Sequence, residues 1–285
     1  MSESPVTESP VTNVSDTARW VAVYRAWESA REDALFNDPF ADSLAGDRGR
    51  AIAKLMPASA RNGWPIIART KLIDDLILGS IADGVDCVVN LAAGFDTRPY
   101  RLALPESLRW VEVDLPPLIE EKTRLLADDK PRCRLARIAA DLTERDATQT
   151  VLQQALTSST RALVITEGLL LYLSEPEVRA LAADFAGRDC VCSWIFDLAS
   201  PTLLGMMRKG MGTHLANAPL KFAPANGVAY FEDLGWRVSR VYSLLHAAGR
   251  WHRLPWLLQL MSKLPEQNPR KLSHARWSGV VQLTR

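Results

Sequence analysis

The chain has 285 residues, with 34 Lys and Arg against 33 Asp and Glu, so its net charge is +1. This balance creates no overall field that would favour nucleic acid or an anionic membrane as a partner. No apolar stretch approaches the roughly 20 residues that span a bilayer, and no cluster of ligand residues predicts a metal site. A chain of this length can bury one full hydrophobic core.

The first residues, MSESPVTESPVTNVSD, have neither a basic start nor an apolar run. They predict a disordered tail over residues 1–15 instead of a signal peptide, and therefore a cytoplasmic protein. Helical periodicity from Asp16 to Leu44, broken at Asp38-Pro39, predicts a helical cap over residues 16–65. We expect residues 16–285 to form one domain.

Apolar runs of strand length alternate with helical patterns through the middle of the chain. Five runs come first: Val85–Leu91, Trp110–Val113, Arg134–Ala140, Ala162–Thr166 and Cys190–Phe196. Two more strands are expected near the C-terminus, at Trp236–Val241 and Trp277–Leu283. Strands that are apolar throughout indicate a mostly parallel sheet covered on both faces. The sequence thus predicts a doubly wound α/β fold with seven strands.

Acidic residues follow three of these strands. Asp114 ends the second, Asp141 follows the third and Glu167 follows the fourth. Ligands bind beyond the carboxyl ends of the strands in such a sheet, so these acids are candidate ligand contacts. Each of them is also a candidate cap for the next helix, above all Asp141, which precedes Thr143.

The first strand leads into a turn with one glycine, Gly94, and Asp114 lies about 20 residues further on. That spacing is typical of a carboxylate that binds a ribose diol. A pyrophosphate needs several glycines so that backbone amides can approach its oxygens, and G-x-G-x-x-G is absent here. The turn therefore favours an adenosine ligand without phosphates over a nicotinamide cofactor.

Arg69 falls among apolar residues on one stripe of the predicted helix Ile66–Asp83. A guanidinium on a buried face is costly unless it is paired. Either it pairs with a core carboxylate, or its fork binds the carboxylate of a ligand that carries an amino acid.

The chain resembles the leucine carboxyl methyltransferase family, and within it the bacterial branch of S-adenosylmethionine-dependent O-methyltransferases. The resemblance is carried by RTKLIDDLILGS, VVNLAAGFDTRPYRL, WVEVDLPPLIEEK and TEGLLLYLSEPEV, and it extends over nearly the whole chain from about Ala18. The string A-G-F-D-T-R-P-Y-R is its most specific part. The resemblance implies a Rossmann-like methyltransferase sheet and S-adenosyl-L-methionine as the cofactor.

It also implies a cofactor site of six residues: Arg69, Gly94, Asp114, Asp141, Leu142 and Glu167. By matching position, Arg69 binds the cofactor carboxylate and Asp114 binds the ribose hydroxyls. Asp141 and Leu142 lie at the adenine, and Glu167 faces the methionine amino group. One departure from the family is Ala92, where many members have a second glycine.

Two residues are candidates for the chemistry itself. His214 lies in the insert Pro201–Ala223, whose glycines predict a mobile lid over the crevice. It is the best-placed base for a hydroxyl acceptor, whereas a carboxylate acceptor is already ionised and needs none. Tyr172, shortly after Glu167, either lines the methyl-transfer pocket or packs in the core.

These features lead to the hypothesis of an O-methyltransferase acting on a carboxylate or hydroxyl of a small metabolite. A protein C-terminal carboxyl methyltransferase and a non-catalytic S-adenosylmethionine-binding protein remain alternatives. We expect a small-molecule acceptor, no nucleic acid and no stable membrane insertion, and the sequence leaves the oligomeric state open.

The segment Leu244–Lys263 is amphipathic and basic, and it contains Trp251 and Trp256. It could contact a membrane or a partner. Because Pro255 splits it, we expect it to pack on the sheet instead.

Overall fold

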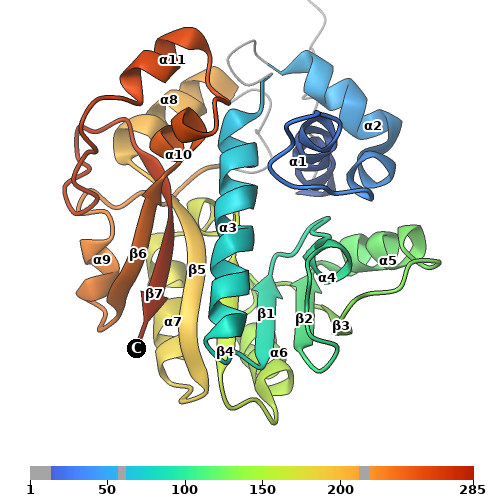
Figure 1. Cartoon of the computed structure of the whole chain (residues 1–285). Coiled ribbons are helices and arrows are strands. Elements are labelled where there is room, and N and C mark those ends of the chain that lie inside the picture. The colour runs from blue at the N-terminus through green and yellow to red at the C-terminus, as the bar shows by residue number, and fades with distance from the viewer. Residues whose placement is uncertain (1–13, 57–61, 212–218) are drawn as a thin grey trace, which may run out of the picture.

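The computed structural model describes residues 14–56, 62–211 and 219–285. Its centre is a seven-stranded sheet in the order β3-β2-β1-β4-β5-β7-β6 (Figure 1). Neighbouring strands are parallel except at β7, which is antiparallel to both β5 and β6. The strands are β1 (Cys87–Leu91), β2 (Arg109–Asp114), β3 (Arg134–Ala139), β4 (Ala162–Thr166), β5 (Val191–Ala199), β6 (Arg237–Ser243) and β7 (Ser278–Thr284).

The strand order reverses beside β1, which pairs with β2 on one side and with β4 on the other. In doubly wound sheets the ligand crevice lies at this switch point, beyond the carboxyl ends of the strands. All seven predicted strands are present, and the predicted doubly wound, mostly parallel fold is confirmed.

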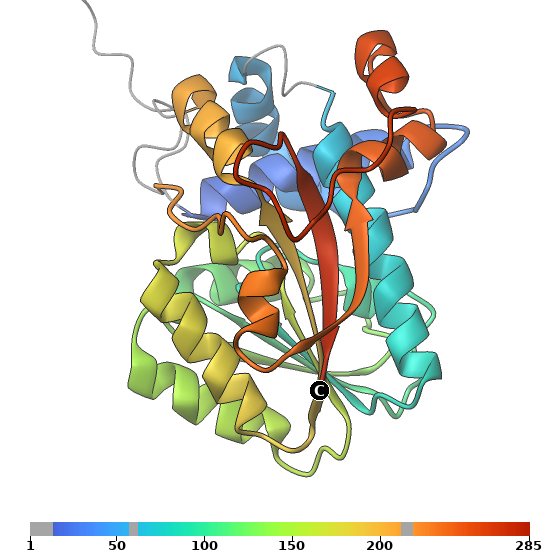
Figure 2. The ribbon, with the colours of Figure 1, turned by 90° about the vertical axis from the view of Figure 1, so that its left-hand side faces the viewer.

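Helices cover both faces of the sheet (Figure 2). Successive residues of β1 serve opposite faces: Val88 packs with helix α3, and Val89 packs with helices α6 and α7. This alternation explains why every β1 residue is buried. One face carries α3 (Trp64–Ala82) and α10 (Leu244–Arg250), and the other carries α6 (Arg145–Leu156), α7 (Glu175–Ala186) and α9 (Ala229–Glu232).

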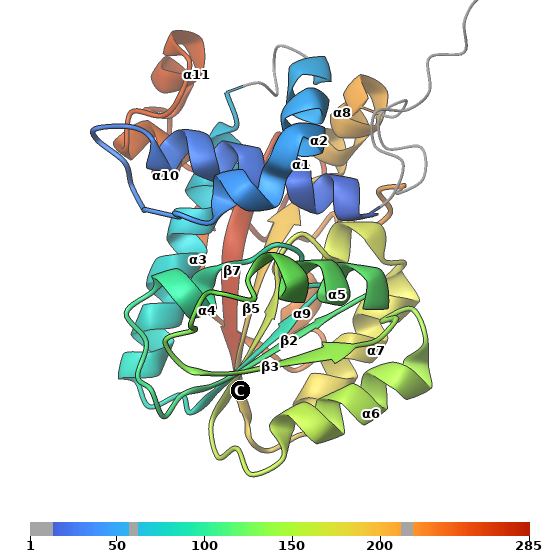
Figure 3. The same ribbon diagram turned by 90° about the vertical axis from the view of Figure 1, so that its right-hand side faces the viewer.

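A third cluster of buried side chains lies under the predicted helical cap. It joins α1 (Val14–Ser29) and α2 (Ala41–Leu55) to α5 (Pro116–Leu125), which follows β2. The two cap helices lie across the carboxyl end of the sheet (Figure 3). They therefore cover the edge where the acids gather. The predicted tail, residues 1–15, falls almost entirely outside the described residues.

The insert Pro201–Ala223, for which the glycines predict a mobile lid, begins with a helix, α8 (Pro201–Met211). Residues 212–218 of the insert lie outside the described residues, so the lid stays a prediction. Ser200 accepts a hydrogen bond from the amide of Leu203, so Ser200-Pro201 is a helix-start signal that outweighs the glycines. The segment Leu244–Lys263 packs only in part: α10 is buried on α3, whereas α11 (Trp256–Met261) contributes no buried residue.

No helix in the described parts of the chain is long and apolar enough to cross a bilayer. Within the same residues, no three His, Cys, Asp or Glu side chains are grouped to hold a metal ion.

Candidate functional site

The glycine turn and the end of β2 are joined by hydrogen bonds. The amide of Gly94 donates to Oδ2 of Asp114 over 2.7 Å, and the amide of Leu115 donates to Oδ1 over 2.8 Å. Burial raises the pKa of Asp114, and these two amides partly oppose that rise. The carboxylate is thus fixed in place at the switch point, with lone pairs left for a further donor.

The turn itself needs two left-handed residues. Gly94 has φ +49°, and Ala92 has φ +56°, a conformation that costs an L-residue about 1–2 kcal/mol. A Cβ added to Gly94 would lie 3.4 Å from the Cβ of Ala18 on α1. The glycine therefore lets the backbone of the turn pass close beneath the helical cap.

Arg69 lies on α3 and forms an ion pair with two carboxylates at the strand ends. Its Nε lies 2.9 Å from Glu167, after β4, and its Nη1 lies 3.1 Å from Asp197, near the end of β5. The other Asp197 oxygen accepts the amide of Gly168 over 2.6 Å. The three charged side chains are 14–16% exposed, so they are partly accessible and not sealed in the core.

Arg98 continues this network into the protein interior. Its Nη1 lies 2.7 Å from Glu167 and 2.9 Å from Asp96, and its Nε lies 2.7 Å from Asp74 on α3. Burial acts to raise the pKa of Asp96, but the charges of Arg98, Lys122 and Arg101 and the amide of Arg98 together outweigh it and hold that pKa at about 2. Arg98 and Arg69 likewise lower the pKa of Glu167 against the effect of burial. Asp96 and Glu167 are therefore ionised at neutral pH.

The same network reaches the helical cap through Asp38. This buried carboxylate lies 2.8 Å from Arg25 of α1 and accepts the hydroxyl of Thr97 over 2.7 Å. Arg25 also donates to the carbonyl of Phe95 over 2.6 Å. In all, five carboxylates and four guanidinium groups are linked: Asp38, Asp74, Asp96, Glu167 and Asp197 with Arg25, Arg69, Arg98 and Arg101.

Asp141 and Leu142 follow β3 and lie beside β2, because the amide of Ala140 donates to the carbonyl of Asp114 over 2.9 Å. The Asp141 side chain accepts from the amide and the hydroxyl of Thr143, at 2.9 and 2.7 Å. Asp141 thus stabilises the turn before α6, whereas the N-cap of that helix is Glu144 and not Asp141, so the cap role that the sequence offered as an alternative is wrong. Leu142 is half-buried against the core. Their place at the adenine stays a prediction.

The two catalytic candidates have different outcomes. His214 lies outside the described residues, so its predicted role stays untested. Tyr172 ends a short 3-10 helix, η1 (Leu170–Tyr172), and is half-buried. Burial raises its pKa to about 12, with smaller influences from the charges of Arg69 and Asp197. Its hydroxyl therefore stays protonated at physiological pH, where it can donate a hydrogen bond but is a poor base.

Of the nine linked residues, only Arg69 and Glu167 are predicted site residues, and the two ion-pair partners that contact them directly, Asp197 and Arg98, are not predicted from the sequence. Asp197 lies one residue beyond the expected end of the fifth strand, so it is a further strand-end acid. Arg98 lies in the short helix α4 (Arg98–Arg101), within the string A-G-F-D-T-R-P-Y-R that carries the resemblance. The strand-end pattern could have found Asp197, whereas no periodicity indicates that Arg98 is buried.

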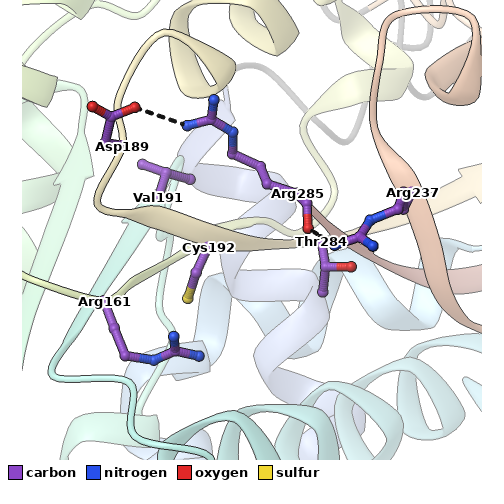
Figure 4. Close-up of a pocket in the computed structure, with 7 residues that line it drawn as sticks. All are labelled: Arg161, Asp189, Val191, Cys192, Arg237, Thr284 and Arg285. Carbon is purple, nitrogen blue, oxygen red and sulfur yellow. Dashed lines mark hydrogen bonds and ion pairs between the residues drawn. The ribbon is translucent and has the colours of Figure 1, made fainter.

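One open hollow lies elsewhere, at the opposite edge of the sheet (Figure 4). It measures about 600 Å³, and its lining includes Arg161, which precedes β4, and Arg285, which lies 3.5 Å from Asp189. None of the strand-end acids borders it. It is therefore separate from the candidate site.

Solved structures with a similar fold support this description. A candidate methyltransferase from Thermobifida fusca matches with a TM-score of 0.58 and 16% identity, over 94% of each chain. A DUF574 family protein from Streptomyces avermitilis matches with a TM-score of 0.57 and 13% identity, over 94% of this chain and 97% of that one. At these identities the two matches show a shared fold, and that fold is Rossmann-like.

The sequence comparisons identify the family. The leucine carboxyl methyltransferase model matches residues 18–186. A Frankia alni protein named as a candidate S-adenosyl-L-methionine-dependent methyltransferase is 37% identical over 83% of this chain and 87% of its own length. A Streptomyces coelicolor protein described in the same words is 38% identical over 59% of this chain. The chain belongs to the leucine carboxyl methyltransferase family, as its resemblance predicted.

The chain matches less than two thirds of the length of the first two curated relatives. The alignment covers 62% of the Streptomyces coelicolor relative and 58% of a Parafrankia relative that is 35% identical.

Proposed function

We propose that the chain is an S-adenosylmethionine-dependent O-methyltransferase that methylates a carboxylate or hydroxyl group of a small metabolite. The observation that carries this proposal is the fixed Gly94–Asp114 pair beside the ion pair of Arg69 and Glu167 at the switch point. Membership of the leucine carboxyl methyltransferase family supports the same activity.

The adenosine part of the cofactor fits the turn. A carboxylate offers about four acceptor positions, and the amides of Gly94 and Leu115 use two of those on Asp114. The remaining positions suit the two hydroxyls of a ribose. A single glycine is enough, because no phosphate has to approach the backbone. Asp141 and Leu142, next to Asp114 on the neighbouring strand, would lie at the adenine.

The charge of the network fits the methionine part. Five linked carboxylates against four guanidinium groups leave an excess of negative charge near the crevice. That excess suits a ligand with a sulfonium and an ammonium group but one carboxylate. Arg69 would hold the ligand carboxylate and Glu167 its ammonium group, so each would exchange part of its present ion pair for a ligand contact.

The residues around the site mainly orient the reactants. The bound cofactor supplies an electrophilic methyl group, and the protein aligns the acceptor with it. Tyr172 would donate a hydrogen bond to the acceptor, since its raised pKa keeps the hydroxyl protonated. A carboxylate acceptor needs no further group, whereas a hydroxyl acceptor would lose its proton to His214.

A small acceptor is favoured over a protein C-terminus because the family match does not include the later part of the chain. The family model ends at residue 186, before α8 and the helices that follow β6. The part of the chain that would enclose the acceptor therefore lies outside the matched region, and activity on a protein C-terminus is not inherited with the family.

The test uses the purified chain, S-adenosylmethionine labelled in the methyl group, and separate small-molecule and protein fractions of a bacterial lysate. We expect label in the small-molecule fraction, and release of methanol by alkali would distinguish an ester from an ether. Label confined to the protein fraction would overturn the choice of acceptor. Cofactor binding without any transfer would indicate a non-catalytic binding protein.

A further inference from the structure

Helix α11 exposes apolar side chains in a manner unusual for a water-exposed helix. Trp256 is 75% exposed, and four neighbours are 40–61% exposed: Leu257, Leu260, Met261 and Leu264. Single exposed apolar residues are ordinary, but a contiguous group of five marks an interaction surface.

The polar side of α11 faces the protein, which holds the apolar side outward. The Gln259 amide donates to the carbonyl of Gly249 on α10 over 2.8 Å, and the Ser262 hydroxyl donates to the Gln259 carbonyl over 2.8 Å. A Cβ added to Gly249 would lie 2.5 Å from the Cβ of Ser262, so only glycine permits this contact. The helix is thus fixed on α10, which is itself buried against α3.

The chain around these residues is strongly basic. Residues 250–276 contain six Lys and Arg and one Glu, although the whole chain has a net charge of only +1. Two of the six are neutralised, because Arg253 pairs with Glu28 and Arg270 pairs with Glu232. The other four are exposed and form no ion pair with a residue that the structure describes. Arg250 and Lys263 flank α11, whereas Lys271 lies beside α9 and Arg276 lies beside the start of α8.

The combination identifies the kind of partner. A second copy of this surface would bring like charges together, which opposes self-association. An exposed apolar group that includes a tryptophan and is flanked by Arg250 and Lys263 suits the interface of a bilayer that contains anionic lipids. We propose that the α11 surface, defined as Trp256, Leu257, Leu260, Met261 and Leu264 with the flanking cations Arg250 and Lys263, docks on an anionic membrane.

The docking surface lies at the end of the molecule that carries the candidate site. Helix α11 stands beyond the same sheet edge as α1, α2 and α8 (Figure 1). Docking would therefore turn the carboxyl edge of the sheet toward the membrane. The proposal concerns peripheral binding and does not depend on the proposed methyl transfer.

The test is co-sedimentation of the full chain with vesicles of phosphatidylcholine alone or mixed with phosphatidylglycerol. We expect binding to the mixed vesicles only, weakened by salt. The double variant Trp256→Ser/Leu260→Ser should lower the partition coefficient by about tenfold or more, because it removes buried apolar area. Arg250→Gln/Lys263→Gln should also lower it about tenfold or more, at roughly fivefold for each charge.

Matched controls are available among exposed residues on other helices and loops. Leu55→Ser changes an apolar residue that is 62% exposed on α2, and Arg124→Gln/Lys130→Gln removes two exposed cations near α5. Both should leave the partition unchanged. Brominated lipid should quench part of the tryptophan fluorescence, and Trp256→Phe should abolish that part.

Three results would overturn the proposal. One is equal binding of all variants, and another is absence of binding to either vesicle, as expected if the surface binds an acidic protein. The third is a lipid-independent dimer, detected by analytical ultracentrifugation, that Trp256→Ser/Leu260→Ser dissociates.

Discussion

The amide of Gly94 and the carboxylate of Asp114, 20 residues apart in the chain, are joined by a hydrogen bond of 2.7 Å. The bond links the turn after β1 to the end of β2, the two neighbouring strands beside the switch point. It positions the carboxylate before any ligand arrives, which lowers the cost of binding. Four predictions test this site and its surroundings.

Asp114→Asn should weaken binding of S-adenosylhomocysteine by about tenfold or more, because an amide has one acceptor oxygen instead of two. The control is Asp86→Asn. Asp86 also accepts a backbone amide, that of Thr160, but lies at the opposite edge of the sheet. Both variants should lose some stability in urea unfolding. Equal affinity of the two variants in calorimetry would remove Asp114 from the site.

Arg69→Gln should weaken cofactor binding by roughly 2–5 kcal/mol, as expected for loss of one partner of a desolvated charge pair. The ligand-free protein should also lose about 1–3 kcal/mol, because Glu167 and Asp197 share this cation. Arg161→Gln, at the opposite edge, should change neither quantity appreciably. Lower stability with unchanged cofactor affinity would mean that Arg69 is only structural.

Ala92→Gly should raise the free energy of unfolding by about 1 kcal/mol, since Ala92 has φ +56° and glycine adopts that conformation without strain. Its neighbour Ala93 has no positive φ and is buried. Ala93→Gly should therefore lower the stability by about 0.5–1 kcal/mol or more. Thermal unfolding of the two variants, side by side, checks the opposite signs.

Asp96 should make the fold sensitive to acid. Its pKa is lowered from 3.8 to about 2 in the folded state. The ionised carboxylate therefore stabilises the folded state fully at any pH above the pKa of the unfolded chain. That contribution, about 2 kcal/mol, should be lost as the pH falls from about 4 to about 2. Asp96→Asn should be less stable at pH 7 but should show a flatter decline. Parallel profiles in urea unfolding would contradict the assignment.

The layout of the fold could be predicted because each strand is a short apolar run between helical patterns. β1 is buried along its whole length, and its pattern was unambiguous. The α8 helix is hard to predict because Gly205 and Gly210 argue against a helix, and only the Ser200-Pro201 start indicates one. The exposed α11 was missed because hydrophobicity alone does not say whether a face is covered.

The site could be predicted only where one residue and its strand carry the information. The position of Glu167 and Asp114 at strand ends and of Arg69 on a helix stripe predicts them as site residues, and they lie at the carboxyl edge of the sheet. Their partners depend on contacts between distant segments: Arg98 reaches Asp74, 24 residues away, and Arg69 reaches Asp197, 128 residues away. No local pattern records such pairings, so the network became visible only in the folded chain.

Calorimetric titration of the purified chain with S-adenosylhomocysteine and, separately, with NAD tests the central claim most directly. A nucleoside without phosphates should fit the single-glycine turn, whereas a pyrophosphate lacks the backbone amides that it needs. We predict saturable binding of S-adenosylhomocysteine with one site per chain and no heat from NAD. Tight binding of NAD with no response to S-adenosylhomocysteine would contradict the account.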